Sequence, residues 1–292
     1  MRSDHADGPH EHDRGLSHDL PVLARRRMIR LMAGAGLIPL VGCTSETSET
    51  PGTSGASGAS GASGTSGASG KAAGGAASSS AEECAAIPEE TAGPFPGDGS
   101  NGVNVLKESG VVRSDIRSSF GDSAGGTAEG VPLTVTLTVV DAAGDCGTPK
   151  EGAAVYVWHC DREGNYSLYS EGVTEENWLR GVQETDAKGQ VSFTTVFPGC
   201  YPGRWPHIHF EVYGSLADAT AATAITSTSQ LAFPRDVCER VYKTDGYRES
   251  GVNLRSLSIE TDTVFSDGHD RQLATVEGSP GAGFTASLVV PV

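Results

Sequence analysis

The chain has 292 residues and a formal net charge of −16 at pH 7. From Cys43 onward no basic run offsets the acidic residues, which argues against nucleic acid or an anionic lipid surface as a partner. Residues 83–292 have a mixed composition and are long enough for one substantial hydrophobic core. We therefore expect one folded domain there.

The first 42 residues indicate an export signal. Arg25 and Arg26 precede a short apolar run that ends at Cys43 and is too short to span a bilayer comfortably. The arginine pair resembles a twin-arginine signal, and residues 40–43, LVGC, resemble a bacterial lipobox, whose cysteine carries the lipid. An ordinary secretory signal with a chance cysteine is the alternative. We expect residues 1–42 to be removed and lipidated Cys43 to anchor the chain at the outer face of the cytoplasmic membrane.

A low-complexity stretch follows the proposed lipid site. Residues 43–82 are dominated by Gly, Ser, Ala and Thr and offer almost nothing to bury. Such a segment cannot offset the entropy of ordering its backbone. We expect it to be a flexible tether between the anchor and the domain.

Strands dominate the expected secondary structure of the domain. Alternating or β-branched apolar runs separated by Gly, Pro and Asp turns are typical of strands in an antiparallel sheet. The only helix that we single out has spaced apolar residues over 235–244. The pattern predicts an all-β fold, a two-sheet β-sandwich core with long loops and few short helices. The expected strands are 133–140, 153–160, 190–197, 207–213 and 285–290.

Five cysteines remain after Cys43, so at least one is unpaired if all disulfides are internal. Outside the cytoplasm, buried or paired cysteines are expected. Cys146 and Cys160 are close in sequence across one expected hairpin, which makes them a candidate pair. Cys200 and Cys238 are the second expected pair.

Two histidines on one expected strand are the first candidate site. His207 and His209 are two residues apart, so both side chains project to the same face and can chelate one metal ion. Solvent exposure, or a single hydrogen-bonded core histidine, explains most such pairs. The neighbouring Tyr201 and the turn residue Tyr166 change the interpretation, because phenolate oxygen beside imidazole is a ligand set that favours Fe(III).

Three linked motifs carry a family resemblance. "VWHCDREGNYS", "TTVFPGCYPGRWPHIHFEVY" and "TSQLAFP" resemble the intradiol ring-cleavage dioxygenases, the family of protocatechuate and catechol dioxygenases. The resemblance implies a non-haem Fe(III) cofactor on a β-sandwich. It also implies O₂-dependent opening of a catechol-type aromatic between its two hydroxyl-bearing carbons, giving a cis,cis-muconate-type product.

The same resemblance assigns roles to six residues. It implies that Tyr201 leaves the metal when the catechol binds and helps to take a substrate proton. Arg204 and Gln230 match the positions that stabilise negative charge on the ketonised substrate. The implied iron ligands are Tyr166, Tyr201, His207 and His209.

The chain also departs from the family pattern. Only five residues separate Tyr201 from His207, fewer than in the well-known enzymes, so the exact catechol cannot be carried over. We expect His159 to be structural and Trp158 and Trp205 to pack. A non-catalytic metal- or ligand-binding β-sandwich module of the cell surface is the alternative function. The oligomeric state stays open.

Overall fold

The computed structural model describes residues 84–143 and 146–292. The expected signal peptide (1–42), the tether (43–82) and the lipidation site Cys43 lie outside the described residues.

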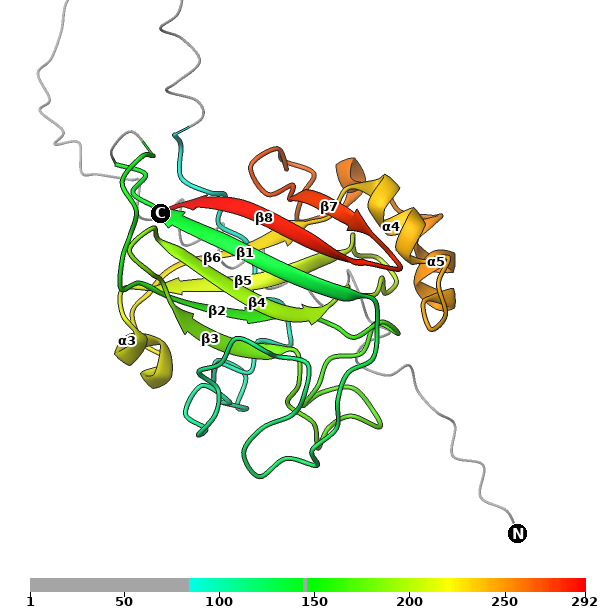
Figure 1. Cartoon of the computed structure of the whole chain (residues 1–292), viewed down its shortest axis with the longest axis horizontal. Coiled ribbons are helices and arrows are strands. Elements are labelled where there is room, and N and C mark those ends of the chain that lie inside the picture. Colours follow the sequence, from blue (N-terminus) through cyan, green and yellow to red (C-terminus); the bar gives the residue numbers. More distant parts are fainter. Residues whose placement is uncertain (1–83, 144–145) are drawn as a thin grey trace, which may run out of the picture.

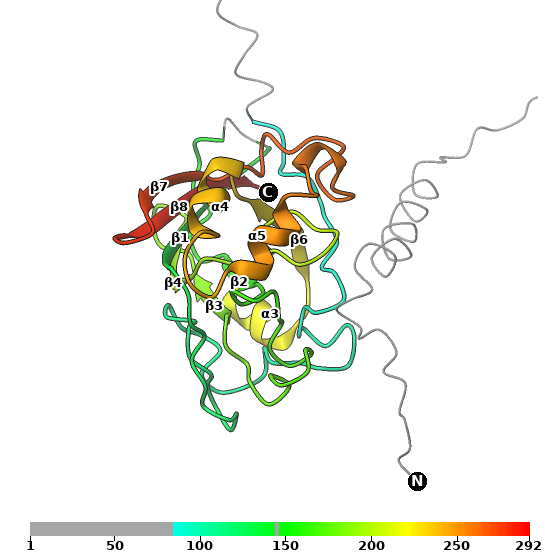
Figure 2. The ribbon, with the colours of Figure 1, turned by 90° about the vertical axis from the view of Figure 1, so that its right-hand side faces the viewer.

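The described chain forms two four-stranded sheets, which confirms the predicted all-β sandwich (Figures 1 and 2). The strand order is β4-β1-β8-β7 in the first sheet and β3-β2-β5-β6 in the second. Neighbouring strands are antiparallel except for the parallel pair β1 and β8. The strands are β1 Pro132–Val140, β2 Ala154–Trp158, β3 Arg180–Glu184, β4 Gln190–Val196, β5 His207–Tyr213, β6 Ile225–Ala232, β7 Thr275–Ser279 and β8 Gly283–Pro291.

Five of these strands lie where the sequence predicts them, whereas β3, β6 and β7 were not predicted. In β6, ITSTSQLA, the last six residues are all buried and four of those six are polar, so burial leaves no apolar alternation to detect. β7, TVEGS, is exposed along most of its length, so it has no buried face and therefore no apolar alternation either.

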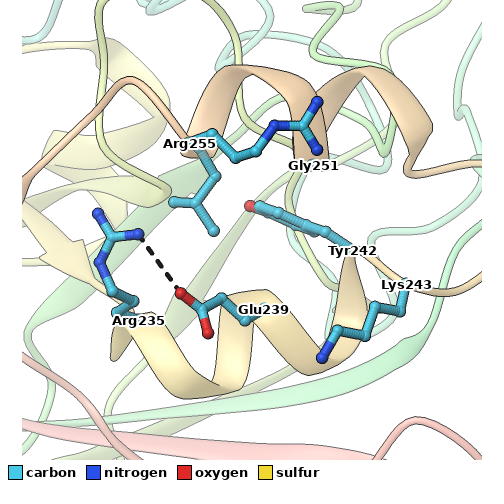
Figure 3. A pocket seen from close by; sticks show the side chains of 7 residues that line it. Arg235, Glu239, Tyr242, Lys243, Gly251 and Arg255 are labelled. Atoms are coloured by element: carbon cyan, nitrogen blue, oxygen red, sulfur yellow. Dashed lines mark hydrogen bonds and ion pairs between the residues drawn. The ribbon is translucent and has the colours of Figure 1, made fainter.

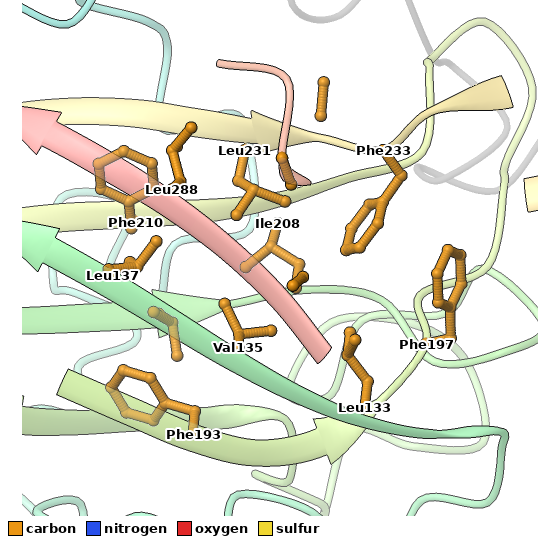
Figure 4. Close-up of a cluster of buried hydrophobic side chains, with 14 of the residues drawn as sticks. Leu133, Val135, Leu137, Phe193, Phe197, Ile208, Phe210, Leu231, Phe233 and Leu288 are labelled. Carbon is orange, nitrogen blue, oxygen red and sulfur yellow. The ribbon is translucent and has the colours of Figure 1, made fainter. Parts of the chain in front are cut away.

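The main core fills the space between the two sheets (Figure 4). β1 shows how it forms, because every second residue, such as Leu133, Val135 and Leu137, is buried against the other sheet while the threonines between them are partly exposed. Ile208 and Phe210 of β5 meet them from the opposite side (Figure 4). This alternation is the period of two that specifies a half-buried sheet.

The second sheet is also buried on its outer face. A separate apolar cluster there joins Tyr156 and Trp158 of β2 to Phe95, Val105 and other residues of the segment that precedes β1. For this reason all seven residues of β5 are buried. The outer face of this sheet is therefore an enclosed compartment, and the functional residues discussed below lie in it.

The segment that covers this compartment is hydrogen-bonded to strands far along the chain. The Ile87 N–H donates to the Pro291 carbonyl at the end of β8 (2.9 Å), and the Glu90 N–H donates to the Thr228 carbonyl in β6 (2.8 Å).

The helices are short and peripheral. The expected helix at 235–244 is α4, Arg235–Val241, which lies beside α5, Arg248–Leu254, at one end of the sandwich (Figures 1 and 2). α3, Leu216–Ala221, and the 3₁₀ turn Ile259–Thr261 were not predicted. Among the residues that the structure describes, none of the helices has the length and apolar character needed to span a membrane.

The expected disulfides are wrong. Cys84 is bonded to Cys146, with 5.2 Å between their Cα atoms, while Cys160, Cys200 and Cys238 are free and buried. Cys146 cannot meet Cys160 because the whole of β2 separates them, about 17 Å of extended chain. The Cys200 thiol faces the Arg204 carbonyl (3.7 Å) and stays a buried thiol.

Candidate metal centre

The two histidines of β5 project together, as predicted. Their neighbour Ile208 is buried in the main core, whereas His207 and His209 point to the enclosed outer face, with 2% and 3% of their surface exposed. Their Nε2 atoms are 3.0 Å apart. Strand periodicity alone therefore brings two imidazole donors to one point.

Two phenols complete the group. Tyr166, in the turn after β2, is 1% exposed, and its hydroxyl lies 3.5 Å from His207 Nε2. The Tyr201 hydroxyl, from the loop between β4 and β5, lies 3.3 Å from the same nitrogen. Metal bonds of about 2.1 Å set at 90–110° separate neighbouring donor atoms by about 3.0–3.4 Å. The three distances from His207 Nε2 to the other predicted ligand atoms, 3.0–3.5 Å, are therefore close to the spacing within one coordination sphere.

The hydrogen bonding of His207 fixes which nitrogen faces this centre. Its Nδ1 donates to the Trp205 carbonyl (2.5 Å), so the lone pair lies on Nε2. Burial first, and then the charge of Arg204, lower the pKa of His207 well below its ordinary value. The imidazole is therefore neutral, the form that binds a metal.

His209 is held by packing. Its ring stacks on Trp158, with centroids 4.9 Å apart and planes 6° apart, as the strand register Trp158–His209 requires. Gly93, with φ +70°, also approaches the ring, since a Cβ on it would lie 3.4 Å from His209 Cε1. Both the ring plane and the close glycine restrict the imidazole to one orientation.

The chemistry of the donors indicates the kind of metal. Burial raises the pKa of the Tyr166 phenol well above its ordinary value. A phenol in this setting gives up its proton only to a strongly acidic metal ion. In the described part of the chain, no three His, Cys, Asp or Glu side chains gather into a metal site. The candidate centre thus depends on its two tyrosines, and hard phenolate oxygens beside imidazole fit Fe(III).

Arg204 and Gln230 are adjacent, as the sequence implied. The register of β5 and β6 places Gln230 opposite His209. Arg204 is 1% exposed, and its Nη2 donates to Gln230 Oε1 (2.6 Å). Gln230 Nε2 in turn donates to the Thr91 carbonyl (2.9 Å). A buried cation is therefore fixed beside the four donor atoms.

Asp262 is a member of this network that the sequence interpretation missed. Its Oδ2 accepts hydrogen bonds from Arg204 Nε (3.1 Å) and from the Trp205 N–H (2.7 Å), and its Oδ1 accepts the Val264 N–H (2.8 Å). Burial by itself would raise the pKa of Asp262, but Arg204 and the backbone N–H groups outweigh it and lower the pKa. Asp262 is the buried counterion of Arg204.

The other conspicuous residues are structural, as expected. His159 Nε2 hydrogen-bonds Thr195 Oγ1 (2.7 Å), and its Nδ1 hydrogen-bonds the Cys160 carbonyl (2.8 Å), so both ring nitrogens are engaged away from the centre. The Trp205 indole is packed in the core and donates to the Phe233 carbonyl (2.9 Å).

Comparisons with known proteins show similarity to dioxygenases. A family model described as Dioxygenase matches residues 113–241. Catechol 1,2-dioxygenase 2 of Acinetobacter lwoffii is 40% identical over 58 residues, 20% of this chain and 21% of that protein. The protocatechuate 3,4-dioxygenase beta chain of Burkholderia cepacia is 31% identical over 115 residues, 36% of this chain and 45% of that one. The chain thus spans less than half the length of these curated relatives.

A solved structure covers more of the fold. The intradiol ring-cleavage dioxygenase from Tetranychus urticae has 26% sequence identity and a TM-score of 0.54, over 71% of this chain and 94% of that one. The sequence over residues 113–241 and the fold of the described domain are therefore both similar to those of the intradiol ring-cleavage dioxygenase family.

Proposed function

We propose that the chain is an Fe(III)-dependent dioxygenase that opens a catechol-type aromatic with O₂. The observation that carries the proposal is the convergence of two imidazole nitrogens and two phenol oxygens on one point, with His207 Nε2 within 3.0–3.5 Å of the other three. Members of this family use non-haem Fe(III). Tyr166, Tyr201, His207 and His209 would hold the metal.

The reaction balances without a further reductant. The bond between the two hydroxyl-bearing carbons breaks, and both oxygen atoms of O₂ enter the product, a cis,cis-muconate-type dicarboxylic acid. Bound Fe(III) would supply the electron withdrawal that makes a chelated catecholate carbon reactive toward O₂.

The two phenols differ in how easily they can move. Tyr166 is 1% exposed, whereas Tyr201 is half-buried in a Pro/Gly-rich loop. Tyr201 is therefore the donor with more freedom to move, and its oxygen would accept one of the hydroxyl protons of an arriving catechol.

Arg204 supplies the fixed positive charge. Its bonds to Gln230 and Asp262 hold the guanidinium in place before any substrate binds. A cation that needs no reorganisation stabilises negative charge as it develops on the substrate. Gln230 acts as a positioning residue through Arg204.

Metal content and visible spectroscopy test this function. The iron-loaded chain should show a phenolate-to-iron absorption band and consume one O₂ per catechol. Tyr201→Phe should shift the band and slow turnover by about 100-fold or more. Tyr169→Phe is the matched control, since Tyr169 bonds Gly97 and Asn101 instead. A chain that binds no iron, or that opens no catechol when loaded, would refute the proposal.

The location is a separate part of the proposal. The lipobox-like LVGC at Cys43 supports a lipid-anchored enzyme at the outer face of the cytoplasmic membrane. The Cys84–Cys146 disulfide supports it further, because disulfides persist in oxidising compartments. Cys43→Ser should move the protein from the membrane fraction to the soluble one. Unchanged membrane association would contradict the anchor.

A further inference from the structure

A small pocket lies between α4 and α5, on a part of the domain that the proposed reaction does not use. Its volume is about 230 Å³, which is below the roughly 300–1,000 Å³ of sites for drug-sized ligands. Figure 3 shows Arg255 extending along α5, with Arg235 and Lys243 on the α4 side. The pocket is lined by Arg235, Glu239, Tyr242, Lys243, Gly251, Leu254 and Arg255.

Positive charge gathers here in a chain that is otherwise strongly acidic. Three cations and a single carboxylate line the pocket, against a net charge of −16 for the whole chain. Arg235 is already engaged, by Glu239 (3.5 Å) and by the Trp205 ring (5.0 Å from the centroid). Lys243 and Arg255 form no ion pair with any residue of 84–143 or 146–292. These two cations are available to an anion.

The floor of the pocket is apolar. Tyr242 and Leu254 are 6% and 3% exposed, and the Tyr242 hydroxyl donates to the Pro198 carbonyl (3.1 Å), which fixes the ring. Gly251 lets α5 approach, since a Cβ there would lie 3.2 Å from the Tyr242 carbonyl oxygen. The site therefore offers a rigid apolar surface with a cation on either side of it.

We propose that this pocket binds a small organic dicarboxylate. Lys243 follows α4 and Arg255 follows α5, so the two available charges come from different segments and suit a ligand with two separated negative ends. The Arg255 guanidinium can form paired hydrogen bonds with one carboxylate and the Lys243 ammonium can bind the other. That this ligand is the ring-opened product rests on the function proposed above, which converts a neutral catechol into a dicarboxylate.

Isothermal titration of the iron-loaded chain with cis,cis-muconate tests the pocket directly. The Lys243→Gln/Arg255→Gln variant should raise the Kd by at least about tenfold. Arg240→Gln should change the Kd by less than about twofold. Arg240 is in α4, close in sequence to Lys243, but it pairs with Asp236 and does not line the pocket. Muconate that binds at the iron would do so equally in the wild type, the double variant and Arg240→Gln, so differences in Kd among them report on the pocket.

Two control ligands and an activity assay distinguish failure of the pocket proposal from failure of the proposed function. Benzoate and inorganic phosphate should bind at least about tenfold more weakly than muconate. Equal affinity for phosphate, equal affinity of the double variant, or no binding at all would overturn the inference. Oxygen uptake with catechol on the same samples tests the proposed function separately, because neither Lys243 nor Arg255 lies at the metal centre.

Discussion

Asp262→Asn removes the buried negative charge that faces Arg204. Both side chains of this pair are 1% exposed. Removing one partner of a buried ion pair leaves the other charge uncompensated and costs about 3–5 kcal/mol. The asparagine amide also presents N–H groups where the carboxylate accepted hydrogen bonds from Arg204 or from backbone N–H groups. We expect the free energy of unfolding to fall by that amount.

An exposed pair provides the matched control. Arg117 and Asp115 are only 2.6 Å apart, closer than the buried pair, but their side chains are 42% and 51% exposed. Asp115→Asn should cost roughly 0–1 kcal/mol, because solvent screens the pair. Urea unfolding followed by tryptophan fluorescence should move the midpoint of Asp262→Asn by about 1–2 M more than that of Asp115→Asn. Equal shifts would show that burial does not govern this pair.

Two further readouts distinguish positioning from stability. The pKa of Asp262 is lowered in the folded state, so its contribution is present above pH about 4 and is lost as the pH falls through the lower folded value. Asp262→Asn should lose this part of the acid sensitivity. At neutral pH the iron-loaded variant should keep its visible absorption band, while its kcat falls about tenfold or more because Arg204 is no longer held in place. An unchanged kcat would contradict the assigned role.

Three more predictions follow from single features. Burial, and then the nearby negative charge of Asp267, raise the pKa of Glu90 to about 7. The wild type therefore loses stability as Glu90 ionises, and Glu90→Gln should become progressively more stable relative to it as the pH rises from 5 to 8. A pH-independent difference in unfolding free energy would contradict this. Cys146→Ser opens a loop of 62 residues and should lower the unfolding free energy by up to about 4 kcal/mol, a loss that reductant should reproduce in the wild type and not deepen in the variant. Gly93→Ala and Gly125→Ala both place a Cβ at positive φ, at a cost of about 1–2 kcal/mol, but only Gly93 faces His209. Iron affinity should therefore fall in Gly93→Ala alone, and equal affinities would rule out the contact.

Much of the site could be read from the sequence because its parts follow local rules. His207 and His209 share a face because a strand repeats every two residues, and β5 has the predicted bounds. Tyr166 was a candidate as a phenol in the turn after a strand, and the family motifs linked it to the histidine pair, which no spacing argument does. The fold class followed in the same way from alternating strands such as β1.

What the sequence did not reveal depends on contacts between distant segments. Asp262 is 58 residues from Arg204, and nothing in its local pattern marks it as a buried counterion. The Cys84–Cys146 bond joins the start of the described domain to the loop before β2, so closeness in sequence led to the wrong pairs. The strand β6 was missed because burial of both of its faces removes the alternation on which strand prediction depends.

The covering segment before β1 sets the order in which the protein can mature. Its Thr91 carbonyl meets Gln230 from 139 residues away, and its Ile87 N–H bonds the Pro291 carbonyl at the end of β8. Such distant contacts close late and make folding slow. The first part of the domain to leave the ribosome can therefore form these hydrogen bonds only after the last strand, β8, has been synthesised. A nascent or C-terminally truncated chain would have all four proposed iron ligands but would lack a closed compartment around them.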